Sequence, residues 1–278
     1  MISLELSYRH CREVARTRAR NFYFSFVMLP ASQRDAMCAV YTFMRYCDDL
    51  SDEPGATRSA MDRWRNALVE ALDGHPDENQ MWPAFLDSVE RYKIPHEYFY
   101  SMIEGVASDL EPVNIRNFDD LYRYCYRVAS VVGLTTIHIF GFTSPEAVPL
   151  AEKCGIAFQL TNILRDVKED AELGRAYIPA EDLERFGVSA DDLKAGRRSD
   201  AFGRLMDFEI ERARSYYRES APLLGLIQPK TRRSLWTLIT IYSRLLERIA
   251  ESRYDVLTRR ISLSVFEKVW IVFRASFK

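Results

Sequence analysis

The stretch of sequence that decides the fold is GIAFQLTNILRDVKED, residues 155–170. Its apolar residues recur at helical spacing and form one flank of a helix, namely Ile156, Leu160, Ile163, Leu164 and Val167. Spacings of three and four bring a second set of side chains onto an adjoining face: Gln159, Asn162, Asp166 and Asp170. A polar stripe beside an apolar flank is costly to bury unless a ligand satisfies it, and these oxygen-bearing groups are typical ligands of hard cations. The helix therefore predicts a packed core on one flank and a Mg²⁺ site beside it.

A second acidic stretch, AVYTFMRYCDDLSDE, covers residues 39–53. Asp48 and Asp52 stack on one helical face, and Tyr41 and Arg45 extend the same stripe toward the N-terminus. Two like charges at this spacing repel each other, so a cation between them would explain the pattern. Taken alone, however, an acidic cluster followed by Pro-Gly is also typical of a solvated helix end.

The two acidic helices together indicate a diphosphate site. Mg²⁺ typically takes one or two carboxylates together with substrate phosphate oxygens, so two facing Asp-bearing helices could clamp a diphosphate between them. Arg45 and Arg165 would neutralise the remaining phosphate charge. The metal would then make diphosphate a good leaving group.

Composition and charge exclude several classes of protein. Hydrophobic residues make up 47% and charged residues 28% of the 278, the balance of a soluble globular protein, and a net charge of −2 gives no basic footprint for nucleic acid. The five cysteines form no CxxC pair, and the N-terminus lacks the apolar run of a signal peptide, so a cytoplasmic location is expected. Residues 264–278 mix aromatic with basic side chains, which fits either a helix packed on the domain or one lying on a membrane surface.

The pattern along the chain is helical almost throughout. Apolar residues recur at helical spacing between short breakers, and no sustained alternation of apolar and polar residues predicts a strand. Loops are expected at residues 53–55, 73–80, 93–95, 111–117, 143–149, 187–200 and 225–230. We therefore expect an all-α protein with one domain over residues 1–278. The aromatic share of 13% exceeds what a helical scaffold needs, and either a Tyr-rich core or a large apolar cavity would use it.

With these residues in view, the chain resembles the squalene/phytoene synthase family, the enzymes that join two prenyl diphosphates head to head. DDLSDE at 48–53 is similar to the first signature of that family, and QLTNILRDVKEDAELGRAYIP at 159–179 to the second. YCYRVASVVG at 124–133 and the basic pair Arg259 and Arg260 extend the similarity over nearly the whole chain. One departure is Asn21, where the family usually has Ser.

The resemblance implies a helical isoprenoid-synthase (terpenoid-synthase) fold with a central cavity. It implies that the Mg²⁺ and diphosphate ligands are Asp48, Asp52, Asn162, Asp166 and Asp170. It further implies phosphate contacts from Arg45, Arg165, Tyr242 and Arg20, a reacting centre lined by Tyr126 and Gln159, and a prenyl channel that begins at Phe22, Phe26 and Tyr41. The Gly-Arg-x-Tyr-x-Pro ending of the second signature brings in Tyr177 as a substrate contact.

The implied reaction ionises one prenyl diphosphate to an allylic cation that the second molecule attacks, giving a cyclopropylcarbinyl diphosphate that a second ionisation opens. The compact chain resembles the bacterial-type enzymes of hopanoid and sterol precursor synthesis, and this resemblance favours two farnesyl diphosphates, with presqualene diphosphate or squalene as product. Phytoene synthesis from two geranylgeranyl diphosphates and dehydrosqualene synthesis stay open, as does a need for NADPH. A terpene cyclase and a non-catalytic assembly or binding protein of the same fold are the competing classes. We expect a monomer or weak dimer, with peripheral membrane association as a possible route for product release.

Overall fold

The computed structural model describes residues 2–52 and 56–277, apart from the side chains at positions 20–22 and 52. Its helices are α1 (Leu4–Arg18), α2 (Arg20–Phe26), α3 (Ala31–Asp52), α4 (Arg58–Leu72), α5 (Trp82–Tyr92), α6 (His96–Ser108), α7 (Phe118–Cys125), α8 (Val131–Phe140), α9 (Ala147–Glu172), α10 (Ala180–Phe186), α11 (Ala190–Lys194), α12 (Asp200–Ser220), α13 (Leu223–Leu226), α14 (Pro229–Glu251) and α15 (Val265–Ala275). A π-helical turn, η1 (Tyr126–Ser130), joins α7 to α8, and a 3₁₀ turn, η2 (Asp255–Leu257), follows α14.

The predicted all-α class is confirmed. The regular elements of the described residues are all helical, and the one β-type contact among them is an isolated β-bridge between Phe142 and Ile227. Two predicted loops are shorter than expected. The loop at 143–149 ends early, since α9 begins at Ala147 and holds Pro149 in its first turn, where a missing N–H costs nothing. The stretch 187–200 contains α11, which a capping box between Ser189 and Asp192 stabilises. The predicted loop at 53–55 lies outside the described residues.

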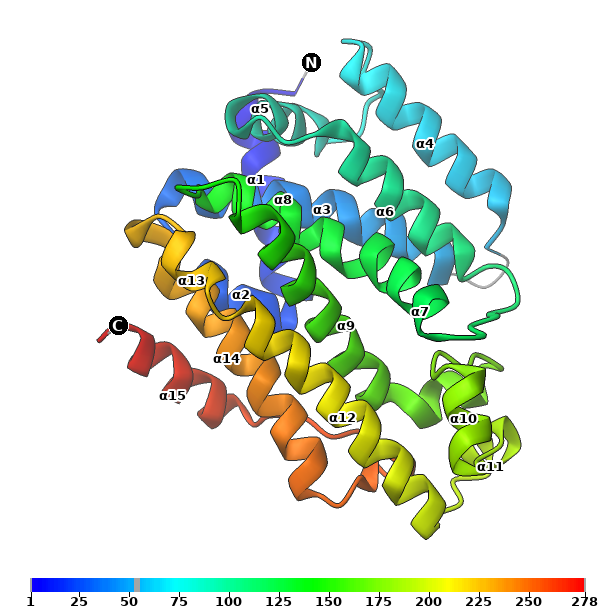
Figure 1. The fold of residues 1–278 in the computed structure, drawn as a ribbon. Helices are drawn as coiled ribbons and strands as arrows, with labels where there is room; N and C mark the ends of the chain where they lie inside the picture. The colour runs from blue at the N-terminus through cyan, green and yellow to red at the C-terminus, as the bar shows by residue number, and fades with distance from the viewer. Residues whose placement is uncertain (1, 53–55, 278) are drawn as a thin grey trace.

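Helix α9, which carries the second acidic motif, is central to the packing. It contacts α8, α12, α14 and η1, and Figure 1 shows it running through the middle of the bundle beside α12. Two glycines allow this close approach. A Cβ on Gly155 of α9 would lie 2.5 Å from the Cα of Ser130, and one on Gly133 of α8 would lie 3.1 Å from the carbonyl oxygen of Ala151. The polar stripe of α9 is therefore held at a fixed distance from η1 and α8.

The buried hydrophobic residues form two clusters, one around α1, α3, α5 and α6 and the other around α9, α12 and α14. Phe158 on α9 packs against both clusters. The assignment of residues 1–278 to one domain stays a prediction.

Stacked rings fill the centre of the first cluster. The ring centroid of Phe43 lies 4.6 Å from that of Phe85 and 5.3 Å from that of Trp64, and the centroids of Trp64 and Trp82 are 5.4 Å apart. Part of the aromatic surplus therefore serves core packing.

Candidate active site

A cavity of about 490 Å³ lies where α3, α9, α14 and the segment before α15 meet. We call it the polar mouth because four cationic side chains line it among apolar ones: Arg18, Arg165, Arg260 and Lys268. Four residues predicted from the sequence line it together: Tyr41, Asn162, Arg165 and Tyr242. Tyr41 comes from α3, Asn162 and Arg165 from α9, and Tyr242 from α14. Helices α3 and α9, which carry the two acidic motifs, therefore both contribute side chains to this cavity, although Asp48, Asp166 and Asp170 are not among its lining residues. The role of these aspartates as ligands stays a prediction.

A second, mostly apolar cavity of about 100 Å³ adjoins the polar one. Asn162 and Tyr242 line both cavities, and predicted Gln159 lines the apolar one. Its other walls are apolar side chains of η1, α8, α9, α13 and α14, among them Val128, Val132, Ile137, Phe158, Leu223 and Leu238. Tyr242 is buried, and its ring stacks on that of Phe158 with the centroids 4.4 Å apart, so two aromatic rings form part of the cavity wall. A polar mouth therefore opens onto an apolar chamber.

The π-helical turn η1 sets the shape of the apolar chamber. It is packed between α6 and α9, because a Cβ on Gly105 of α6 would lie 2.8 Å from the Cβ of Arg127, while Gly155 closes the other side. Val128 and Ala129 of this turn line the chamber. Single π-helical turns inside helices are frequent at functional sites, and this one redirects the chain between α7 and α8.

Arginines and carboxylates pair closely at the polar mouth. The Nε of Arg165 donates to the Oδ1 of Asp166 at 2.8 Å, and a nitrogen of Arg260 reaches the same oxygen at 3.1 Å. Arg260 also lies 3.4 Å from Glu169. Arg165 is 14% exposed and Asp166 16%, so this pair is largely withdrawn from water. A diphosphate entering here would meet two guanidinium groups whose present partner is a motif aspartate.

In the first acidic motif, Asp49 is paired with two arginines. Arg45 donates to Asp49 at 2.8 Å, and Arg18 of α1 reaches the other oxygen of Asp49 at 2.5 Å. The phosphate contact that the resemblance implies for Arg45 stays a prediction. Arg18, Arg45 and Asp49 line a further cavity of about 450 Å³, and Arg18 also lines the polar mouth. Asp48, half-buried on α3, acts electrostatically on Tyr41 and Arg45.

The remaining groups fit a divalent cation. Burial and, to a lesser extent, the negative charge of Asp166 raise the pKa of Asp170 to about 7, whereas Arg175 opposes the shift. The Oδ1 of Asn162 is buried and has no hydrogen-bond partner among the described residues. A buried amide oxygen without a partner and a carboxyl group crowded by a second carboxylate on the same helix are the oxygen donors that Mg²⁺ binds. These residues, with Asp166, would hold the metal.

No three carboxylate, imidazole or thiolate groups converge as a metal cluster within the described part of the chain. Mg²⁺ sites commonly use only one or two carboxylates and complete their octahedron with water and phosphate oxygens. The predicted ligand Asp52 cannot be judged, because its side chain lies outside the described set, as do those of Arg20 and Phe22.

Seven described residues of the predicted site line neither of the two cavities: Phe26, Arg45, Asp48, Tyr126, Asp166, Asp170 and Tyr177. Three of them are the expected substrate contacts or reacting-centre residues Phe26, Tyr126 and Tyr177. Phe26 is 1% exposed and packs edge-on against Tyr41 at 6.4 Å, so it supports the cavity wall from the core. Tyr126 lies among acidic neighbours, and burial, then Glu152, raises its pKa. Tyr177 is buried beside the second motif. Their proposed substrate contacts stay predictions.

Tyr177 has a visible structural role. Its hydroxyl donates to the Oδ1 of Asp109 at 2.8 Å, and its ring stacks on Tyr124 at 4.7 Å. Arg175 donates to the backbone oxygen of Asp109 at 3.2 Å. The Gly-Arg-x-Tyr-x-Pro ending of the second signature therefore ties the segment after α9 to the end of α6, next to Asp170.

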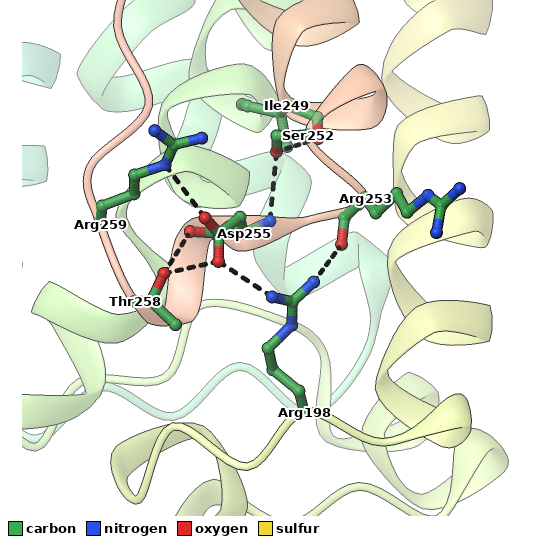
Figure 2. A network of polar contacts seen from close by, with 7 residues as sticks. All are labelled: Arg198, Ile249, Ser252, Arg253, Asp255, Thr258 and Arg259. Atoms are coloured by element: carbon green, nitrogen blue, oxygen red, sulfur yellow. Dashed lines mark hydrogen bonds and ion pairs between the residues drawn. The ribbon is translucent and has the colours of Figure 1, made fainter.

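Two cations of the C-terminal segment, Arg260 and Lys268, also line the polar mouth. The sequence alone predicted no site role for either of them. In the sequence, Arg260 stands out only as half of a basic pair, and Lys268 only as one of the basic residues within 264–278. Asp255 holds the turn that delivers Arg260 (Figure 2): it accepts from Arg198 at 3.0 Å and from Arg259 at 3.0 Å. Nothing local in the sequence links this turn to α9, since the pairing with Asp166 spans 94 residues.

Comparisons with known proteins agree with this geometry. A family model described as squalene/phytoene synthase matches residues 15–267. Phytoene synthase 1, chloroplastic, of Arabidopsis thaliana is 35% identical over 95% of this chain, which spans 64% of the length of that relative. The 15-cis-phytoene synthase of Synechococcus elongatus is 34% identical over 97% of this chain and 92% of its own length.

Solved structures share the fold. A dehydrosqualene synthase in complex with a ligand superimposes with a TM-score of 0.91 at 28% identity, over 99% of this chain and 96% of that one. The squalene synthase HpnC from Alicyclobacillus acidocaldarius gives a TM-score of 0.84 at 30% identity, over 91% of this chain and 97% of its own. The bundle is therefore an isoprenoid-synthase fold. With a family model matched across residues 15–267 and both acidic signatures in place, the chain belongs to the squalene/phytoene synthase family.

Proposed function

We propose that this protein is a Mg²⁺-dependent prenyltransferase that joins two geranylgeranyl diphosphates head to head to form phytoene. The observation that carries the proposal is the pair of adjoining cavities, one polar and one apolar, that share Asn162 and Tyr242. A prenyl diphosphate has the same two-part chemistry. The choice of C20 substrates rests on relatives named as phytoene synthases, which are 34–35% identical along 95–97% of this chain. This choice revises the preference for farnesyl diphosphate, the C15 substrate, that we drew from the sequence.

Each part of the site has a task in this reaction. Arg165, Arg260 and Lys268 would bind the diphosphate, and Asp166, Asp170 and Asn162 would hold Mg²⁺, which supplies charge stabilisation as the C–O bond breaks. The apolar chamber excludes water from the allylic cation, and the stacked faces of Phe158 and Tyr242 stabilise positive charge without capturing it.

A second candidate is the coupling of two farnesyl diphosphates to presqualene diphosphate, squalene or dehydrosqualene. It is favoured by the two solved structures, named as dehydrosqualene and squalene synthases, at 28% and 30% identity. The two candidates differ in the chain length that the apolar chamber accepts. Side chains at its wall, such as Ile137 and Leu223, would set that length.

The test is a product assay with purified protein, Mg²⁺ and either geranylgeranyl or farnesyl diphosphate, each with and without NADPH. Phytoene from the C20 substrate, at a higher kcat/KM than any C15 product, is expected. A preference for farnesyl diphosphate would replace phytoene synthesis by the second candidate, and NADPH dependence would identify reduction to squalene. Cyclic or single-chain products would indicate a cyclase. No turnover of either substrate by folded protein would favour a non-catalytic binding protein.

The matched variants are Asp166→Asn and Asp191→Asn. Asp166 lies at the polar mouth, whereas Asp191 is an exposed carboxylate of α11. Loss of product with the first variant and not the second is expected. Equal activity of both variants would contradict the placement of the site.

A further inference from the structure

The last helix, α15, carries an exposed apolar surface. Ten large hydrophobic side chains are exposed among the described residues, and six of them belong to the short stretch 265–277: Val265, Phe266, Val269, Trp270, Phe273 and Phe277. At 100° per residue these six fall within one arc of a helical wheel. Phe266 is 88% exposed and Phe277 76%. This concentration distinguishes α15 from every other described helix.

The exposed arc is not the side by which α15 attaches to the protein. Ile271 and Ala275 are buried on the opposite side, and a capping box of Ser264 and Glu267 fixes the start of the helix. Glu267 also pairs with Arg248 of α14. The helix is therefore docked by its own inner face and by ion pairs, and the outward arc is additional to what folding requires.

The exposed rings form a continuous patch. Trp270 and Phe273 stack with their centroids 5.5 Å apart, and Phe273 meets Phe277 edge-on at 5.1 Å. Trp and Phe on one face of a surface helix are typical of insertion into the boundary between lipid headgroups and acyl chains. Along residues 2–52 and 56–277 no helix has the length and apolar character to span a bilayer, so any membrane contact of these residues would be peripheral.

Basic side chains border this patch. Arg274 is exposed on α15, and Lys230 and Arg233 are exposed at the start of α14, where they line a groove with Met28 and Trp236. The pairing of Arg248 with Glu267 shows that α15 runs back along α14, so its end approaches that groove. In Figure 1 the C-terminus lies at the same end of the bundle as α13 and the start of α14. Lys230 and Arg233 are exposed basic side chains, which fits an anionic partner surface.

We propose that the outward face of α15, with Arg274, Lys230 and Arg233 beside it, docks the protein on an anionic lipid bilayer. The position of α15 gives the docking a consequence. Lys268 of the same helix lines the polar mouth of the site and lies 5.8 Å from the ring of Phe24 on α2. The bilayer would therefore lie against the helix that forms one wall of the site entrance, which suits a ligand with a long hydrocarbon chain. Bilayer binding itself does not depend on which reaction the site performs.

The experiment is flotation of the full-length protein with vesicles of phosphatidylcholine alone or of equal parts phosphatidylcholine and phosphatidylglycerol. Binding to the anionic vesicles is expected, weakening with added salt because the basic side chains are screened. The variant F266S/W270S/F273S should lose binding by about tenfold or more, since each ring contributes apolar area to the insertion. Leu6→Ser, which removes an exposed leucine of α1, is the matched control and should bind like the wild type.

Two further measurements keep the outcome decisive. Circular dichroism melting should give the same midpoint for the triple variant and the wild type, because the changed side chains are exposed. Quenching of tryptophan fluorescence by bromine-labelled lipid should occur in the wild type and fall in Trp270→Phe, which preserves an aromatic ring. Absence of flotation with both vesicle types, or equal binding by the triple variant, would overturn the proposal. So would a dimer in sedimentation that the triple variant dissociates, because the patch would then be a contact between two copies.

Discussion

Replacing Gly155 by alanine tests how tightly the site depends on helix spacing. The added Cβ would lie 2.5 Å from the Cα of Ser130 and 2.9 Å from the carbonyl oxygen of Ala129, both backbone atoms that cannot rotate away. Carbon atoms pack at about 3.5 to 4.0 Å, so α9 and η1 would have to separate by about 1 Å. Overpacking of this kind typically costs about 1–3 kcal/mol of unfolding free energy, and more where backbone must move.

The displacement also reaches the site, because Gln159 and Asn162 follow one and two turns later on α9. A misplacement of about 1 Å can lower a rate by about 100-fold. We therefore expect Gly155→Ala to lower the melting temperature by several degrees, at about 2–4 °C per kcal/mol, and product formation by at least about tenfold.

The matched control is Gly203→Ala in α12, where an added Cβ would meet no atom within 4 Å. This variant should be unchanged or stabilised by up to about 1 kcal/mol, because alanine has the higher helix propensity. Both proteins would be compared by calorimetry and by the product assay. A Gly155→Ala protein as stable and active as Gly203→Ala would refute the claim that close contact between α9 and η1 positions the site.

Three further predictions follow from the charged groups. Asp166→Asn should lower product formation by about 100-fold or more and raise the Mg²⁺ concentration needed for half-maximal rate, and an unchanged Mg²⁺ titration would contradict its role as a ligand. Burial raises the pKa of Glu209 from 4.5 to about 7, so its contribution to the free energy of unfolding is present below about pH 4.5 and is lost as the pH rises through 7. Glu209→Gln should therefore flatten the dependence of unfolding free energy on pH in this range, as measured by denaturant titrations at several pH values. An unaltered pH dependence would contradict this role of Glu209. Asp255→Asn should loosen the turn that positions Arg260 beside Asp166 and so lower product formation several-fold. Asp191→Asn is the control and should be unaffected. An undiminished rate in Asp255→Asn would mean that the turn does not need this carboxylate.

The buried group around Glu209 explains why that titration reports on folding. Arg212 lies 2.8 Å from both Glu209 and Asp182, and its guanidinium stacks over the ring of Phe118 at 4.4 Å. This network joins α10 and α12 beside the segment that follows the second signature. Removing one partner of a buried ion pair leaves the other charge uncompensated, which commonly costs about 3–5 kcal/mol.

The sequence by itself determined the helices and the faces they present. Spacings of three and four place Asn162 and Asp166 on one face of α9 and fix an apolar flank beside them, because helical geometry depends only on neighbours within two turns. The same local rule predicted α3 and its acidic stripe. The resemblance of the two signatures then predicted the family, which the comparisons confirm.

Only the tertiary structure decided which side chains meet between helices. Arg260 reaches Asp166 across 94 residues, Arg18 reaches Asp49 across 31, and Phe26 and Tyr126 lie outside the cavities that similarity alone suggested for them. Such contacts depend on how whole helices pack and on turns such as the one that Asp255 holds. A local periodicity carries no information about these distances, because they are set by the close packing of many residues far apart in the chain.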